Sequence, residues 1–399
     1  MAVVTRTPRV PRTPRLTRTP RVTRKRAWTA LLTALVLAVL TGLLLPGPAV
    51  AEGTSGESVA HIDAVTEGDG PRTTDIIATS ADNAVVAWRE GTVPGKVDQG
   101  YIRYAFTTNG GASWSHPKVL AQETSEYTWH YVILYQSGTE LFAYMGRTKA
   151  NSDNKNGLPI DAIVVKRSTD EGHTWQDYPV TMPLDLPDTT ADEGFANLIM
   201  AGRPTKLASG KHVIPFWASN RENGVLISSD LKTWTAGGVV PDPSALKPGE
   251  SQVAVSQDDP NKLVMVARSD AAYTRAATAT SSDGGLTWTP FTLDNIPSYN
   301  VKVQFIKDST GRYLSIHNTA TNRDVLNYKT KRAGAAWNAG RLFANGSAAD
   351  EDPDQAGTAG KGWDTYAMAD EYAPGKFYVA WEFDTSRIKV NRLDISDAP

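Results

Sequence analysis

SSDGGLTW (residues 281–288) is a tight polar turn that runs directly into a tryptophan. Ser281 and Asp283 can hydrogen-bond the backbone of their own turn, the glycines permit positive φ, and Trp288 can anchor the turn on neighbouring strands. The same order of residue types recurs in TTNGGASW (107–114), STDEGHTW (168–175) and SSDLKTW (228–234), and in degenerate form in TKRAGAAW (330–337). Recurrence of one turn along a single chain indicates a repeat architecture.

The tryptophans that end these copies set the size of the repeat. They stand at positions 114, 175, 234, 288 and 337, so consecutive copies are 61, 59, 54 and 49 residues apart. The segments around the turns are short, β-branched and aromatic, and they are bounded by Gly, Pro, Asn or Asp, as strands are. They include AVVAWRE (84–90), YIRYAFTT (101–108), AIVVKRST (162–169), GVLISSD (224–230), KLVMVARS (262–269) and KFYVAWEF (376–383).

A unit of about four short strands repeated around an axis is a β-propeller blade. Residues 52–399 number 348, which gives 58 residues for each of six blades and matches the tryptophan spacing. No stretch of this region has a long apolar stripe at helical period. The sequence therefore predicts an all-β fold, a six-bladed β-propeller over residues 52–399.

The first 51 residues differ in composition from the repeats. Residues 1–26 carry eight Arg and one Lys, an apolar run follows at 30–45, and PGPAVA ends at Ala51. This order predicts a secretory signal peptide over residues 1–51 and a secreted, extracellular protein without stable membrane insertion after cleavage. A membrane anchor is the alternative interpretation, since the apolar run is just short of spanning length.

Charge and cysteine content exclude several classes of function. Beyond residue 51 the chain has 32 basic and 43 acidic side chains, a net charge of −11, which argues against nucleic acid as a partner. The chain has no Cys, and its six His lack paired spacing, so we expect no zinc site and no disulfides. Phosphate-loop and dinucleotide fingerprints are also missing from the sequence, and we expect no cofactor.

The turns and the blade count together resemble the sialidase (neuraminidase) superfamily, whose repeated turns are called Asp-boxes or BNR repeats. The resemblance implies a retaining exo-α-sialidase whose site lies at the centre of the propeller, with sialylated glycans as partners. Sialic acid carries a carboxylate on its anomeric carbon, so its site needs arginines in fork geometry. The same carboxylate repels an anionic nucleophile, which is why sialidases use a tyrosine activated by a glutamate.

The family order of site residues is Arg, Asp, Glu, Arg, Arg, Tyr, and this sequence can be matched to it residue by residue. The resemblance assigns the substrate carboxylate to Arg72, Arg268 and Arg323, the nucleophile to Tyr366, its base to Glu250 and the acid/base role to Asp98. The match is strongest from 250 to 385, where Glu250, Arg268 and the turn at 281 follow in family order. Where the family usually has Arg-Ile-Pro, this chain has Arg72-Thr73-Thr74.

Two of the arginines have competitors nearby in the sequence. Arg268 ends an apolar strand, which favours it over Arg275. Arg312 follows Gly311 in a predicted hairpin turn, so we expect it to face solvent and Arg323 to be the site residue.

Other residues have structural interpretations as well. Tyr366 competes with Tyr372 and Tyr378, and Tyr378 alternates within an apolar strand, as core residues do. Asp98 lies in PGKVDQG and could be one more turn aspartate, and Arg72 could cap a strand at the surface.

Two other classes of function stay open at this point. A propeller with these turns could be a glycosidase or polysaccharide lyase for another acidic sugar, or a lectin that keeps the arginines without the chemistry. A lyase would not require the tyrosine–glutamate pair in this form, and a lectin would not require the nucleophile. The repeats account for the chain after residue 51, so we expect no added carbohydrate-binding domain. We also expect a monomer.

Overall fold

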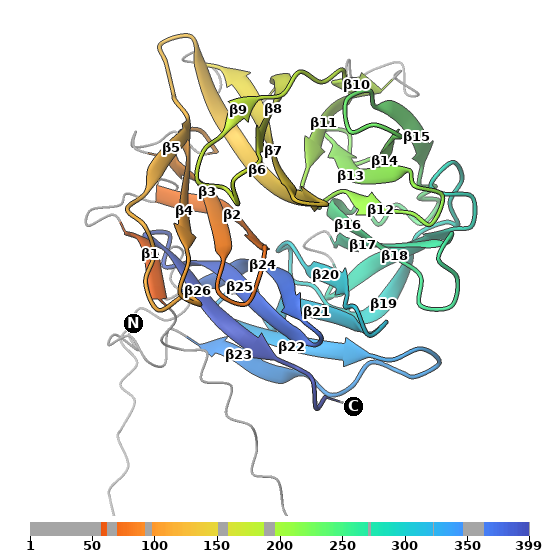
Figure 1. Ribbon diagram of the computed structural model, residues 1–399. Helices are drawn as coiled ribbons and strands as arrows, with labels where there is room; N and C mark the ends of the chain where they lie inside the picture. Colours follow the sequence, from red (N-terminus) through yellow and green to blue (C-terminus); the bar gives the residue numbers. More distant parts are fainter. Residues whose placement is uncertain are drawn as a thin grey trace, which may run out of the picture. The chain divides into compact units, whose positions relative to one another are not determined.

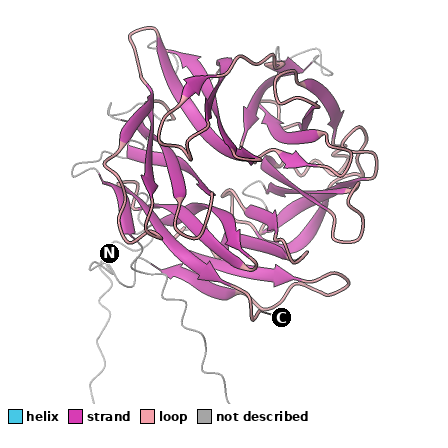
Figure 2. Cartoon of the chain, viewed as in Figure 1, coloured by secondary structure: helices cyan, strands magenta, loops and turns pink. Residues whose placement is uncertain are grey.

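The computed structural model describes residues 57–61, 70–91, 98–150, 159–186, 196–269, 273–321, 323–345 and 363–398, all within the unit Val50–Pro399. The predicted signal peptide, residues 1–51, lies outside the described residues. Every regular element within these ranges is a β-strand, as Figure 2 shows. No described segment is a helix long and apolar enough to cross a membrane.

The strands form six antiparallel sheets, the blades of a six-bladed β-propeller, and they follow one another around a common axis (Figure 1). The first blade holds β2 (Gly70–Ala78), β3 (Ala84–Gly91), β4 (Tyr101–Thr107) and β5 (Lys118–Ala121), and the second holds β6 (Tyr127–Ser137), β7 (Glu140–Lys149), β8 (Ile160–Ser168) and β9 (Gln176–Asp177). The fourth holds β16 (Gly249–Val255), β17 (Leu263–Arg268), β18 (Arg275–Ser281) and β19 (Thr292–Pro297), and the fifth holds β20 (Gln304–Lys307), β21 (Tyr313–Asn318), β22 (Val325–Lys331) and β23 (Arg341–Asn345). The predicted fold class is confirmed.

The sixth blade closes the ring with both ends of the described chain. It holds β24 (Asp364–Ala373), β25 (Lys376–Phe383) and β26 (Arg387–Asp394), and its outermost strand is β1 (Glu57–His61). β1 pairs antiparallel with β26, so the earliest described strand completes the last blade. Closure in this way leaves only short sheet edges exposed.

The third blade departs from the predicted four strands. It holds β10 (Asp185–Leu186), β11 (Ala196–Met200), β12 (Thr205–Lys206), β13 (His212–Ala218), β14 (Asn223–Ser228) and β15 (Thr235–Val239). β11 and β12 both pair with β13, so the inner edge of this blade is one strand interrupted at residues 201–204. Pro204 lies in the interruption and has no N–H to donate to a ladder.

The repeated turns connect the last two strands of a blade in the first five blades. In the copy at 281–288, Asp283 Oδ1 accepts the N–H groups of Leu286 (3.0 Å) and Thr287 (2.9 Å), and Ser281 Oγ accepts the N–H of Gly285 (2.8 Å). The side chain of Trp288 is buried. The aspartate and serine thus satisfy the turn's own backbone, which explains why the motif recurs wherever this turn is needed.

The hydrophobic core lies between the blades. In the described residues it forms six clusters, and each cluster joins two blades that are neighbours in the ring. Because both faces of each blade are buried, the strands are apolar on both sides, as in β3, where Val85, Val86 and Ala87 are all fully buried.

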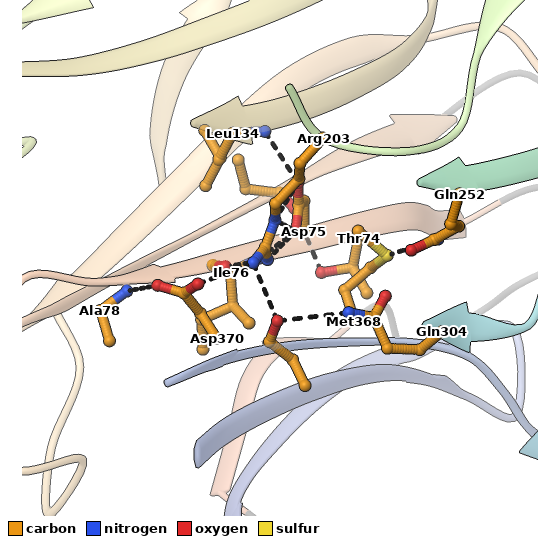
Figure 3. A network of polar contacts seen from close by, with 12 residues as sticks. Thr74, Asp75, Ile76, Ala78, Leu134, Arg203, Gln252, Gln304, Met368 and Asp370 are labelled. Atoms are coloured by element: carbon orange, nitrogen blue, oxygen red, sulfur yellow. Dashed lines mark hydrogen bonds and ion pairs between the residues drawn. The ribbon is translucent and has the colours of Figure 1, made fainter. Parts of the chain in front are cut away.

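A polar network crosses the axis of the propeller (Figure 3). Arg203, from the interrupted strand of the third blade, donates to Asp75 in β2 (Nε–Oδ1 3.0 Å) and to Asp370 in β24 (Nη1–Oδ1 2.9 Å). The network draws on all six blades through Asp75, Leu134, Arg203, Gln252, Gln304 and Asp370. The innermost strands are thereby held together at one level of the axis.

Candidate active site

The predicted site residues converge although they lie on different blades. Arg72, Asp98, Glu250, Arg268 and Tyr366 line one cavity of about 300 Å³. The sixth residue, Arg323, adjoins it, since its guanidinium carbon lies 5.8 Å from the centre of the Tyr366 ring. They come from the first, fourth, fifth and sixth blades.

The inner strands bulge where they supply these residues. The ladder register shifts between Arg72 and Asp75 in β2, between Gly249 and Gln252 in β16, and between Thr365 and Met368 in β24. A bulge inserts an unpaired residue and re-aims its side chain, and bulges are common next to active sites. Glu250 and Tyr366 lie inside two of these bulges, and Arg72 is the last paired residue before the third.

The backbone at the site is also strained. Asp98, Glu250, Arg323 and Tyr366 all have positive φ, at 57°, 39°, 63° and 53°, and so does Thr73 beside Arg72, at 50°. Residues other than glycine rarely adopt this region, and such strain clusters at functional sites, where the surrounding structure maintains it. Four of the six predicted residues carry it themselves.

Tyr366, Glu250 and Arg268 form one contact group. The phenol of Tyr366 donates to Glu250 Oε2 at 3.4 Å, and Arg268 Nη1 donates to the same oxygen at 2.6 Å and to the phenol oxygen at 3.0 Å. The tyrosine proton therefore already points at a carboxylate that could accept it.

The electrostatics of the group favour an ionised glutamate beside a neutral tyrosine. Burial and the charge of Glu250 raise the pKa of Tyr366 to about 12, against the opposing effect of the arginines. Burial also acts to raise the pKa of Glu250, but Arg268, together with Lys302 and the hydrogen bond from Tyr366, outweighs burial and holds that pKa below its ordinary value. Glu250 is thus a carboxylate at neutral pH, ready to accept a proton.

The arginines are fixed by partners of their own. Arg72 Nε contacts Glu382 Oε2 at 3.3 Å, and Glu382 is almost fully buried at the end of β25. Asn300 serves the other two: its Oδ1 accepts from Arg268 Nε at 3.0 Å, and its carbonyl accepts from Arg323 Nη2 at 3.0 Å. Guanidinium groups held in this way are pre-organised to bind an anion.

Asp98 faces a positively charged wall of the cavity. Burial acts to raise its pKa, but Arg89, whose Nη2 lies 3.4 Å from Oδ1, lowers it together with Arg72 and Arg268. The imidazole of His130 is itself buried, which lowers its pKa to about 4, so it is neutral at pH 7. Asp98 is therefore ionised in the ligand-free site.

Sequence reasoning missed several residues of the site. His130, Trp217 and Lys302 line the cavity, Asn300 bridges two arginines and Arg89 pairs with Asp98. No local sequence motif surrounds them, although His130, like Glu250 and Tyr366, lies in a bulge of an inner strand, here β6.

The competing residues lie elsewhere. Arg275 is exposed at the start of β18, and Tyr378 is buried in the core with its hydroxyl on the carbonyl of Ala81, as predicted. The prediction that Arg312 faces solvent is wrong. It is buried because Asp308 and the carbonyls of the C-terminal segment bind its guanidinium.

Within the described ranges, no group of three or more His, Asp and Glu side chains is arranged to hold a metal ion. The cavity suits an anionic ligand, because four cationic side chains surround it: Arg72, Arg268, Arg323 and Lys302.

The BNR repeat-like domain family matches residues 82–383. The chain belongs to this family. No curated protein matches the sequence. Among solved structures, Hadza microbial sialidase Hz136 is similar with a TM-score of 0.66 and 16% identity, over 86% of this chain and 69% of that one.

Two further structures extend the comparison. The intramolecular trans-sialidase from Ruminococcus gnavus, solved with oseltamivir carboxylate, has a TM-score of 0.62 at 15% identity and covers 87% of this chain and 99% of its own. A protein of unknown function from Dyadobacter fermentans has a TM-score of 0.56 at 17% identity, over 86% and 99%. At these identities the similarity is one of fold, which is the sialidase-like six-bladed propeller.

Proposed function

We propose that this member of the BNR repeat-like family is a retaining exo-α-sialidase that hydrolyses terminal sialic acid from glycoconjugates. The observation that carries the proposal is the contact group of Tyr366, Glu250 and Arg268 in a cavity that is also lined by Arg72. The solved structures similar in fold that are named as sialidases support it.

The cavity suits one terminal sugar with a carboxylate. Its volume of about 300 Å³ is at the small end of ligand sites, which run from about 300 to 1,000 Å³. Arg72, Arg268 and Arg323 surround the Tyr366 ring and would bind the carboxylate through charge-assisted hydrogen bonds. An apolar wall, including Ile199, Met200 and Trp217, faces the same space.

The reaction follows from these positions. The O–H bond of Tyr366 breaks, its proton passes to Glu250, and the phenol oxygen forms a bond to the anomeric carbon as the glycosidic C–O bond breaks. Asp98 protonates the leaving oxygen and then takes a proton from the water that releases the sugar from Tyr366. Two displacements at one carbon give net retention.

Asp98 must gain a proton before it acts as an acid. Its pKa is lowered in the ligand-free site by Arg89 and other positive groups. A substrate carboxylate brings a negative charge among these groups, which offsets their effect and favours the protonated form.

The N-terminal segment supports a proposal about location. Its basic stretch, apolar run and small residues before Ala51 are the features of a secretory signal. We propose that the protein is exported and acts on extracellular glycans as a monomer.

The test is release of sialic acid from an aryl sialoside, with the anomeric configuration of the first product followed by proton NMR. The proposal predicts turnover with retention, and loss of turnover in Tyr366→Phe. Failure to cleave any sialoside, together with cleavage of a uronic-acid polymer, would instead support a glycosidase or lyase for another acidic sugar. Binding without turnover would support a lectin.

A further inference from the structure

Lys302 is a fourth cation at the cavity that the family order of site residues does not include. It lies two residues before the inner strand β20, it is 5% exposed, and it lines the cavity with Tyr366. Its ammonium nitrogen lies 5.5 Å from the centre of the Tyr366 ring. Among the described residues, no hydrogen bond or ion pair to this ammonium is present.

A buried ammonium is costly unless a negative charge faces it. The carboxylates that act on Lys302 are Glu250, Asp75 and Glu382, but each of these already pairs with an arginine. Lys302 therefore adds positive charge beyond the arginine that already pairs with each of these carboxylates, and it lies beside the Tyr366 ring.

The reaction creates the negative charge that is missing. When Tyr366 gives its proton to Glu250, the phenol oxygen becomes anionic. At that moment the three arginines are engaged by the substrate carboxylate, whose own charge offsets their effect on the phenol. Lys302 keeps an uncommitted charge near the ring.

We propose that Lys302 is a positioning residue that stabilises the ionised form of Tyr366 while the arginines bind the substrate carboxylate. This inference rests on the proposed function, since it concerns the nucleophile of that reaction. Lys302 acts through Tyr366 and need not touch the substrate.

The pH dependence has a definite sign. Burial lowers the pKa of Lys302 below its ordinary value, in spite of the three carboxylates and together with the repulsion of Arg203. The pKa of Tyr366 is raised by the charge of Glu250 and lowered by the charges of Arg268, Arg323 and Arg72. Since arginine stays charged, the first of these groups to lose a positive charge as pH rises is Lys302, and turnover is expected to fall with it.

Steady-state kinetics of Lys302→Met and Lys302→Arg test the proposal. The ammonium of Lys302 lies 5.5 Å from the centre of the Tyr366 ring. At about this separation and an effective dielectric constant of about 20, a unit charge changes an ionisation on the order of 100-fold. We expect Lys302→Met to lower kcat by that order with KM within about threefold. Lys302→Arg is expected to recover most of the loss and to move the alkaline limb of the kcat profile to higher pH. Unchanged kcat in Lys302→Met, or an arginine variant with the wild-type alkaline limb, would overturn the proposal.

A second measurement does not depend on turnover. Trifluorotyrosine placed at position 366 has a much more acidic phenol, so it titrates while Lys302 is still charged, and fluorine NMR follows its ionisation. We expect the pKa of this phenol to rise by about 1 to 2 units when Lys302 is replaced by Met, which corresponds to 10- to 100-fold. An unchanged phenol pKa would show that Lys302 acts only as structural charge.

The two measurements separate the failure of one proposal from the failure of the other. If the phenol pKa depends on Lys302 but the protein is inactive on every sialoside, the role of Lys302 as the stabilising cation is retained and the proposed sialidase activity is wrong. If the protein is an active sialidase but its phenol pKa does not change when Lys302 is replaced, the proposed function is retained and the role given to Lys302 is wrong.

Discussion

Replacement of Arg268 by lysine separates the geometry of the guanidinium from its charge. Arg268 contacts Glu250 at 2.6 Å, the phenol of Tyr366 at 3.0 Å and Asn300 Oδ1 through Nε at 3.0 Å. A lysine ammonium can reach one of these groups but cannot keep the fork that is held by Asn300.

The magnitude follows from the bonds that lysine cannot make. Loss of one charge-assisted hydrogen bond to the substrate carboxylate costs about 1.5–3 kcal/mol, so kcat/KM is expected to fall about 10- to 150-fold. The variant Arg268→Ala is expected to have only a somewhat lower kcat/KM than Arg268→Lys. The reason is that the ammonium in Arg268→Lys pairs with the nearer Glu250 and not with the substrate carboxylate.

The assay is kcat/KM on an aryl sialoside at 25 °C, with thermal melting to show that each variant folds. Arg275→Lys is the matched control, because Arg275 is exposed on β18 and outside the cavity, and it is expected to keep full activity. If Arg268→Lys stays within twofold of the wild-type protein, the role given to Arg268 is wrong.

Three further changes probe the base, the acid and the axis. Glu250→Gln removes the proton acceptor of Tyr366, so kcat on aryl sialosides is expected to fall by about 10²- to 10⁴-fold, and a smaller loss would argue for another base. Asp98→Asn is expected to slow natural sialosides far more than aryl sialosides with good leaving groups. Because the pKa of Asp98 is lowered, kcat/KM of the wild-type protein on natural sialosides should fall as pH rises through the acid range. Equal losses in Asp98→Asn on natural and on aryl sialosides would exclude the acid role. Arg203→Met leaves the fully buried Asp75 unpaired and is expected to cost about 3–5 kcal/mol in urea unfolding at pH 7, whereas a loss under 1 kcal/mol would mean that the axial network contributes little.

The sequence predicted the blades because their turns are locally encoded. In the copy at 281–288, Asp283 and Ser281 satisfy the backbone of their own turn, so the pattern is visible without knowledge of the fold. The interruption between β11 and β12 was not predictable, because Arg203 is placed there by partners on other blades, Asp75 and Asp370.

The same distinction applies to the site. Glu250, Arg268 and Tyr366 lie in segments with a recognisable order of strand, arginine and turn, and the structure brings them into contact. Asn300 and Lys302 have no such context, and their relation to the site depends on how the fifth blade faces the fourth and sixth. The burial of Arg312 likewise depends on the C-terminal segment, far away in the sequence.

Trapping the glycosyl–enzyme intermediate tests the proposed mechanism most directly. A 3-fluorosialosyl fluoride, which slows release of the bound sugar, is incubated with the protein, and peptide mass spectrometry locates the added mass. We expect one sugar bound through Tyr366, and no adduct in Tyr366→Phe. An adduct on a carboxylate such as Asp98 or Glu250, or turnover with inversion and no adduct, would contradict this mechanism.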